Sequence, residues 1–136
     1  MHARPDLHLP AELAPEIAQR FSGIDRLYGR GALARLAASH VTVVGIGGVG
    51  SWAVEALARS GVGALTLVDA DELCVSNTNR QLPALDGQYG RMKIEAMAER
   101  CRAINPHIRL QLEPRFLTPS NLAELLQTPG DLVLDA

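Results

Sequence analysis

The glycine-rich run Gly45-Ile46-Gly47-Gly48-Val49-Gly50 matches the pattern G-x-G-x-x-G. It follows the β-branched run 41–44, which is typical of a buried strand, and it precedes 51–60, which is predicted to be a helix. Glycines let the main chain approach phosphate groups closely, and a helix start presents unpaired N–H donors and a partial positive charge. The alternative is a tight strand-to-helix turn that binds nothing. The context predicts nucleotide contacts by the glycines of this run: Gly45, Gly47, Gly48 and Gly50.

An acidic residue follows the next apolar run. Residues 65–68 are predicted to form a second strand, and Asp69 comes directly after it. A carboxylate at this point of a βαβ unit accepts hydrogen bonds from ribose hydroxyl groups. NAD and ATP both contain such a ribose. The loop and the acid alone therefore predict a dehydrogenase first and leave an ATP-dependent enzyme open.

Two basic residues beyond the second strand bear on this choice. Arg80 lies in the polar run 76–81, and Lys93, the only lysine among the 13 basic residues, stands near the start of a helix predicted over 90–104. A positive charge there is mildly unfavourable for the helix dipole unless an anion lies beside it. An arginine fork and a lysine point charge suit a triphosphate, whereas the bridging pyrophosphate of NAD needs less positive charge. The pair favours ATP, and the alternative for either residue alone is an ordinary solvated side chain.

Five short motifs occur in one order along the chain: G-x-G-G-x-G-S, D-x-D, S-N-x-x-R-Q, G-x-x-K and I-N-P. In this order they resemble the ubiquitin-activating-like (ThiF/MoeB/HesA) superfamily, over about residues 20–136. Four segments, 26–29, 44–52, 55–61 and 74–81, look most similar to the tRNA threonylcarbamoyladenosine dehydratases of that superfamily. The joint pattern is much more specific than the glycine run alone.

The resemblance implies a set of contacts to ATP, with Gly48 and its neighbours at the nucleotide and Asp69 at the ribose. It also implies a homodimer, because an arginine before the first strand reaches into the ATP site of the partner subunit in this superfamily. Arg26 is the match for that arginine, and Arg20 is the alternative, because the spacing to the glycine run differs from that in MoeB-type members. The residues expected at the phosphates are Asn77, Arg80 and Lys93, and those expected to be catalytic are Arg26, Arg80 and Lys93.

The implied activity is ATP-dependent activation of a carboxylate as an acyl-adenylate, with Mg²⁺ as a second cofactor. In the dehydratases the substrate is tRNA, whose threonylcarbamoyladenosine closes to a cyclic form with loss of water, and a sulfur-transfer protein is a candidate partner. The superfamily's magnesium-binding Asp-x-x-Asp would begin at Asp135 and end beyond Ala136, so we assign no metal ligand within the chain. Three alternatives stay open: adenylation of a ubiquitin-like sulfur carrier, an NAD-dependent oxidoreductase, and a nucleotide-binding or dimerising module without turnover.

Strand and helix patterns alternate along the chain, which predicts an α/β fold: a Rossmann-like, doubly wound parallel sheet with helices on both faces and a short helical N-terminal extension. Further strands are expected at 108–112 and 132–134, and a further helix at 120–126. Helical pieces are expected over 17–39, with breaks at the glycines of that stretch: Gly23, Gly29 and Gly31.

We predict a flexible segment over 1–19 and an ATP-binding adenylation domain over 20–136. The last predicted strand has no following helix to cover it, so we expect the chain to be a piece of a longer protein. Such a piece should bind nucleotide without completing the reaction. The alternative is a terminal strand that a partner subunit buries.

Composition limits the partners and the location. A net charge of −2 and a pI near 6.1 exclude a module that holds nucleic acid by basic charge alone, so an RNA-binding surface is expected mostly elsewhere. Cys74 and Cys101 form no C-x-x-C pair and the histidines show no ligand spacing, so neither a disulfide nor a metal site is expected. Trp52 is expected to pack, and Cys74 to be a small buried residue. No apolar run reaches the roughly 18 residues of a membrane span, and we expect a cytoplasmic protein without membrane contacts.

Overall fold

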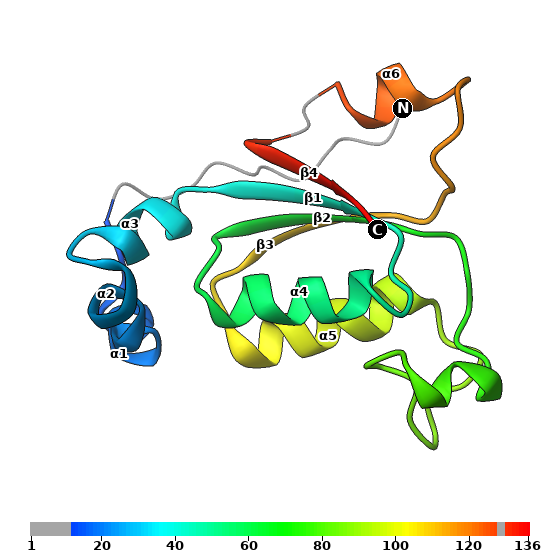
Figure 1. Ribbon diagram of the computed structural model, residues 1–136, viewed down its shortest axis with the longest axis horizontal. Coiled ribbons are helices and arrows are strands. Elements are labelled where there is room, and N and C mark those ends of the chain that lie inside the picture. Colours follow the sequence, from blue (N-terminus) through cyan, green and yellow to red (C-terminus); the bar gives the residue numbers. More distant parts are fainter. Residues whose placement is uncertain (1–11, 128–129) are drawn as a thin grey trace.

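The centre of the chain is a parallel sheet of four strands: β1 (His40–Val44), β2 (Ala64–Val68), β3 (Arg109–Glu113) and β4 (Leu132–Asp135). The computed structural model describes residues 12–127 and 130–136. The spatial order of the strands is β3-β2-β1-β4 (Figure 1). All three pairings are parallel, which confirms the predicted sheet.

Apolar side chains of the strands and of two helices form the main core. Val43 of β1 pairs in register with Leu67 of β2, and neither side chain is exposed. They belong to one buried cluster with Met97 and other side chains of α4 (Gly50–Arg59) and α5 (Lys93–Ile104). Every residue of β2 is buried, as expected of an inner strand in a parallel sheet.

Helices lie on both sides of the sheet, as predicted. Figure 1 shows α4 and α5 together on one side and the short α6 (Leu122–Leu125) on the other. The connections from β1 to β2 and from β2 to β3 each contain one of the two long helices, which is the βαβ arrangement of a Rossmann-like fold.

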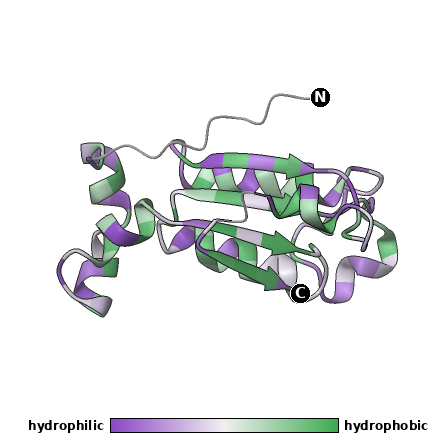
Figure 2. Ribbon diagram, turned by 90° about the horizontal axis from the view of Figure 1, so that it is seen from above, coloured by the Kyte–Doolittle hydropathy of each residue, from purple (hydrophilic) through white to green (hydrophobic). Residues whose placement is uncertain are grey.

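Three short helices precede the sheet: α1 (Pro15–Arg20), α2 (Ser22–Tyr28) and α3 (Ala32–Ala37). They lie at the amino end of the strands, and Figure 2 shows them mixed in hydropathy while hydrophobic residues concentrate on the strands. Ile17, Phe21 and Leu33 form a second small buried cluster. Part of the segment predicted to be flexible is thus helical, and residues 1–11 of that segment lie outside the described residues.

One predicted helix break is wrong. Gly23 lies inside α2, and the chain instead turns at Phe21, whose buried ring packs with Ile17. Burial of an apolar side chain here outweighs the weak helix propensity of glycine. The other two breaks are confirmed, because Gly29 and Gly31 both have positive φ angles, of 98° and 87°.

The helix predicted from Gly90 begins three residues later, at Lys93. The backbone before it is engaged elsewhere: the Gly90 amide donates to the carbonyl of Leu73, and Glu72 forms an antiparallel bridge with Met92. These contacts close the base of the long loop between β2 and α5. None of the helices in the described part of the chain is long and apolar enough to cross a membrane.

Candidate nucleotide-binding site

The predicted site residues after β1 and β2 lie at the carboxyl end of the sheet. The connection after β1 goes to β2 on one side, whereas β4 lies on the other side of β1, so the strand order reverses between β1 and β4. Ligands of open α/β sheets bind at such a reversal point. The glycine loop 45–50 begins there, directly after β1 (Figure 1).

Two glycines of the loop are required by the fold itself. Gly45 has a φ of +90°, and a Cβ on it would overlap the carbonyl oxygen of Ala136. A Cβ on Gly50 would overlap the carbonyl oxygen of Gly45. Any side chain at either position would therefore force the loop, β4 or the start of α4 to move.

The other two glycines are not required in this way. Gly47 and Gly48 lie outside the left-handed φ region. A Cβ on Gly47 would meet only Nε2 of Gln81, at 3.8 Å, and one on Gly48 would lie 3.3 Å from the flexible Arg80 side chain. Neither backbone strain nor a backbone clash explains glycine here. A ligand that approaches the main chain closely does explain it.

Four successive amide groups of the loop have no acceptor among the residues that the structure describes; they belong to Gly47, Gly48, Val49 and Gly50. They precede or begin α4, a helix of ten residues that no side chain caps. Unpaired N–H groups at the positive end of a helix dipole form a site for an anion, and a phosphate group fits it.

Asp69 connects this loop to the second strand. Its carboxylate is buried and accepts hydrogen bonds from the amide of Ile46 at 2.7 Å and from that of Asp71 at 2.8 Å. A carboxylate offers about four lone-pair directions, so the two amides leave capacity for ribose hydroxyl groups. Asp69 thus also fixes the shape of the glycine loop, a role that the sequence did not reveal.

Asn77 lies in a short 3₁₀ helix, η1 (Val75–Asn79), within the loop after β2. Its side chain is buried, and Oδ1 accepts a hydrogen bond from the Cys74 amide at 2.8 Å. The Nδ2 group has no partner within residues 12–127 and 130–136 and stays available as a donor. Cys74 is exposed, so the expectation that it is buried is wrong.

Arg80 follows η1 and lies against the glycine loop, because a Cβ added to Gly48 would lie 3.3 Å from its side chain. Its side chain is exposed, and Nη1 donates to Oδ1 of Asn79 at 2.9 Å. The indole of Trp52 donates to the Arg80 carbonyl at 2.8 Å while 55% of the tryptophan stays exposed. Trp52 therefore fixes the backbone of Arg80 and does not pack in the core.

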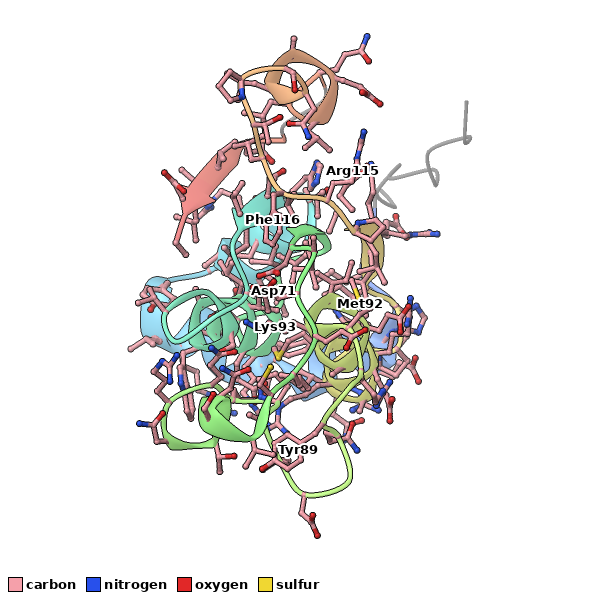
Figure 3. The ribbon with its side chains drawn as sticks, turned by 90° about the vertical axis from the view of Figure 1, so that its right-hand side faces the viewer. Asp71, Tyr89, Met92, Lys93, Arg115 and Phe116 are labelled. Carbon is pink, nitrogen blue, oxygen red and sulfur yellow. The ribbon has the colours of Figure 1, made fainter. Side chains whose placement is uncertain are left out.

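Lys93 is buried, with 8% of its side chain exposed, so the interpretation as a solvated lysine is wrong. Nζ lies 3.7 Å from Oδ2 of Asp71, and that aspartate is itself more than half exposed. One distant carboxylate compensates a buried ammonium group poorly. Figure 3 shows Lys93 and Asp71 between the segment that carries Tyr89 and the segment of Arg115 and Phe116. An anion beside Lys93 would stabilise its charge.

Two predicted arginines are not part of this arrangement within one chain. Arg26 is exposed on α2, at the amino end of the sheet and so at the opposite end from the glycine loop (Figure 1). Arg20 lies at the same end, where Nη1 is 3.4 Å from the carbonyl oxygen of Ile104. A role for either arginine at the phosphates requires a second subunit.

Asp135 ends β4 and pairs in register with Val44, directly before the glycine loop. Among the described residues, no three His, Cys, Asp or Glu side chains form a group that could hold a metal ion. Mg²⁺ in nucleotide sites commonly uses one or two carboxylates together with phosphate oxygens, so Asp135 fits the role of a single protein ligand.

Two polar residues of the motifs lie at the loop, and the sequence assigned neither of them a role. Ser51 donates to the Gly47 carbonyl at 2.5 Å and accepts from the Leu82 amide at 3.2 Å, which joins the loop to the segment after η1. Gln81 is buried, and its Oε1 is without a partner in the described part of the chain. Their places in the G-x-G-G-x-G-S and S-N-x-x-R-Q motifs were the available signal.

The fold and the carboxyl edge of the sheet define a Rossmann-like α/β domain whose glycine loop can receive an anion. The ThiF family model matches residues 22–136, and the chain belongs to the ThiF family.

Solved and curated relatives agree with this assignment. The tRNA threonylcarbamoyladenosine dehydratase of Haemophilus influenzae is 53% identical over 118 residues, which cover 87% of this chain and 45% of that protein. The Escherichia coli molybdopterin-synthase adenylyltransferase is 41% identical over 97 residues, or 71% of this chain and 39% of that protein. The crystal structure of the E. coli tRNA N6-threonylcarbamoyladenosine dehydratase, TcdA, in complex with ATP has a TM-score of 0.90 and 51% identity, covering 92% of this chain and 51% of that one. The chain thus spans about half the length of these relatives.

Proposed function

We propose that this chain binds ATP and forms the adenylating half of an enzyme that activates a carboxylate. The observation that carries the proposal is the buried Lys93 ammonium group, which Asp71 compensates poorly. It lies at the same edge of the sheet as the loop 47–50, whose four amides have no acceptor among the described residues. Both features favour a ligand with several negative charges. The ATP complex of the E. coli relative supports the choice of ATP.

A carboxylate resists substitution because its leaving group would be an oxide or hydroxide. Attack of the carboxylate oxygen on the α-phosphate of ATP forms an acyl-adenylate and releases pyrophosphate. AMP is then a good leaving group. The chain's part is to position the nucleotide and to stabilise charge: the loop amides, Arg80 and Lys93 hold the phosphates, and Asp69 holds the ribose. Mg²⁺ would neutralise phosphate charge, with Asp135 as one ligand.

The finer proposal is a tRNA threonylcarbamoyladenosine dehydratase. Its acyl-adenylate forms on the modified nucleoside, a nitrogen of the same nucleoside displaces AMP, and a ring closes with net loss of water. The name and the 53% identity of the H. influenzae relative support this substrate. A homodimer, in which Arg26 or Arg20 reaches the partner's phosphates, and a cytoplasmic location belong to the same proposal.

The rival within the family adenylates the C-terminal glycine of a ubiquitin-like sulfur carrier. The 41% identity to the E. coli molybdopterin-synthase adenylyltransferase supports this alternative. The two differ in the acceptor carboxylate and share the nucleotide chemistry, so the residues at the carboxyl edge of the sheet do not separate them.

The experiment that tests the proposal measures release of AMP from α-labelled ATP. The acceptors are tRNA that bears threonylcarbamoyladenosine, the same tRNA without the modification, and a ubiquitin-like sulfur carrier. We expect release with the modified tRNA alone. Release with the carrier alone would establish the rival. The assay is run on the 136-residue chain and on a form extended by the remaining length of the relatives, and we expect turnover only from the longer form.

Binding of the nucleotide is tested separately with 2′,3′-dideoxy-ATP, which lacks the ribose hydroxyl groups. A hydrogen bond to a charged group contributes about 1.5–3 kcal/mol, so the dissociation constant should rise about 10- to 150-fold relative to ATP. Equal affinity of the two nucleotides would show that Asp69 has only its structural role toward Ile46 and Asp71.

A further inference from the structure

A surface pocket of about 410 Å³ lies at the other end of the sheet from the glycine loop. The last turns of α4 and α5 and the turn between α1 and α2 surround it. Its walls combine guanidinium groups with apolar side chains, from the residues Arg20, Phe21, Arg59, Arg100, Ala103 and Ile104.

Positive charge dominates this pocket. Three of its six lining residues are arginines, and within residues 12–127 and 130–136 the one carboxylate bonded to them is that of Glu55. Burial alone would raise the pKa of Glu55, but hydrogen bonds from Arg100 and Arg59 hold that pKa below its ordinary value. Glu55 therefore stays ionised at neutral pH, and it offsets one of three positive charges.

Many of the guanidinium donors remain unused. Arg59 donates only Nε to Glu55, at 2.7 Å, and Arg100 donates Nε and Nη2 to the same carboxylate, at 2.6 and 3.0 Å. Both Nη groups of Arg59 and the Nη1 of Arg100 have no acceptor among residues 12–127 and 130–136. Because guanidinium groups stay charged and match tetrahedral oxyanions in geometry, these donors form a site for a phosphate group.

The helix dipole explains only part of this arrangement. A cation in the last turn of a helix is favourable, which accounts for basic residues at the ends of α4 and α5. Arg102 shows what this effect produces alone: it lies in the last turn of α5, is exposed, and does not line the pocket. Arg20 and Arg59 also lie in the last turns of α1 and α4, but the dipole does not explain why they converge with Arg100 on one cavity.

We propose that this pocket binds a backbone phosphate of the RNA substrate, an inference that rests on the proposed function. A free nucleotide fits the pocket less well, because both oxygens of Glu55 are engaged and none of the six side chains that line the pocket in the described part of the chain accepts hydrogen bonds. Exposed guanidinium groups, with 60% of the Arg59 and 42% of the Arg100 side chain accessible, suit a large polyanion that approaches from outside. Phosphate contacts of this kind fix the orientation of a nucleic acid without reading its sequence.

The test compares tRNA binding by the unchanged chain, Arg59→Gln and Arg102→Gln, by fluorescence polarisation over a series of salt concentrations. Arg59→Gln should weaken binding about three- to tenfold and reduce the slope of log K against log [salt] by about 0.7–0.9, the value for one lost phosphate contact. Arg102→Gln should change neither quantity appreciably. ATP affinity should be equal in all three proteins, and thermal unfolding checks that each is folded.

A second measurement does not depend on any variant. Inorganic phosphate is titrated into the unchanged, ¹⁵N-labelled chain, and we expect the side-chain Nε–H signals of Arg59 and Arg100 to shift more than that of Arg102. Equal effects of the two substitutions on tRNA binding, or no measurable tRNA binding, would overturn the inference. If phosphate shifted the arginine signals but Arg59→Gln did not change tRNA binding, the pocket would be a small-anion site and the inference would fail. The inference would also fail if poly-glutamate displaced tRNA as effectively as unlabelled RNA does. If tRNA binds as described but the form extended by the remaining length of the relatives releases no AMP from ATP with the modified tRNA, the proposed function fails and this inference stands.

Discussion

Replacement of Lys93 by methionine separates a role in ligand binding from a role in folding. Methionine keeps most of the apolar stem that Lys93 buries and removes the ammonium group. The lost ion pair with Asp71 is worth little, because the two atoms are 3.7 Å apart and more than half of the Asp71 side chain is exposed. The substitution also removes the desolvation cost of a buried charge.

The expected effects on stability and on binding therefore differ. The free energy of unfolding of Lys93→Met should lie within about 1 kcal/mol of the unchanged chain or above it. ATP binding should lose a charge-assisted hydrogen bond, worth about 1.5–3 kcal/mol, which raises the dissociation constant about 10- to 150-fold.

Urea unfolding and isothermal titration calorimetry measure the two quantities on the same preparations. Arg91→Met is the matched control, because Arg91 lies two residues away and pairs with Glu99 at 2.8 Å on the surface. It should leave ATP affinity unchanged. If Lys93→Met bound ATP within threefold of the unchanged chain, or lost more than about 3 kcal/mol of stability, Lys93 would be a structural residue.

Three further predictions use other parts of the structure. Gly47→Ala should fold normally, since its Cβ has room, but should weaken ATP binding. Gly50→Ala should lower the midpoint of thermal unfolding, because its Cβ would overlap the carbonyl oxygen of Gly45. Equal losses of stability in the two variants would refute this distinction. The pKa of Glu55 is lowered in the folded state, so the stabilising contribution of its carboxylate should be complete above the ordinary pKa of 4.5 and should disappear as the pH falls through the lowered pKa. The difference in unfolding free energy between the unchanged chain and Glu55→Gln, measured in urea between pH 7 and pH 3, should therefore shrink only in the acid range. Burial raises the pKa of the Cys101 thiol to about 12, so Ellman's reagent should titrate only the exposed Cys74 in the native chain and both thiols in denaturant; two fast-reacting native thiols would contradict the burial.

The order of strands and helices was predictable from the sequence because it depends on local patterns. Apolar runs such as 65–68 end at polar residues, and the motif G-x-G-x-x-G has a fixed place between a strand and a helix. The turn at Phe21 was not predictable, since it depends on packing against Leu33, which lies in another helix. The start of α5 at Lys93 also depends on a distant pairing, between Glu72 and Met92.

The identities of the site residues were accessible from the sequence, whereas their environments were not. The sequence predicted a phosphate contact for Lys93 near a helix start and left a solvated side chain as the alternative, and only the closure of the loop after β2 shows that Lys93 is buried. The motif D-x-D indicated a ribose contact for Asp69 but gave no sign that its carboxylate also holds the Ile46 amide. The pocket beside Arg59 has no local motif, because its walls come from three separate helical segments.

The measurement that tests the central claim most directly is calorimetric titration of the chain with ATP and, separately, with NAD. ATP should bind, because the amides of the loop 47–50 have no acceptor in the described part of the chain and because Arg80 and the buried Lys93 supply positive charge. NAD carries less negative charge, so it should bind much more weakly or not at all. Lys93→Met should reduce ATP binding in the same experiment. Tight binding of NAD together with no measurable binding of ATP would contradict the account and support the alternative of an NAD-dependent oxidoreductase.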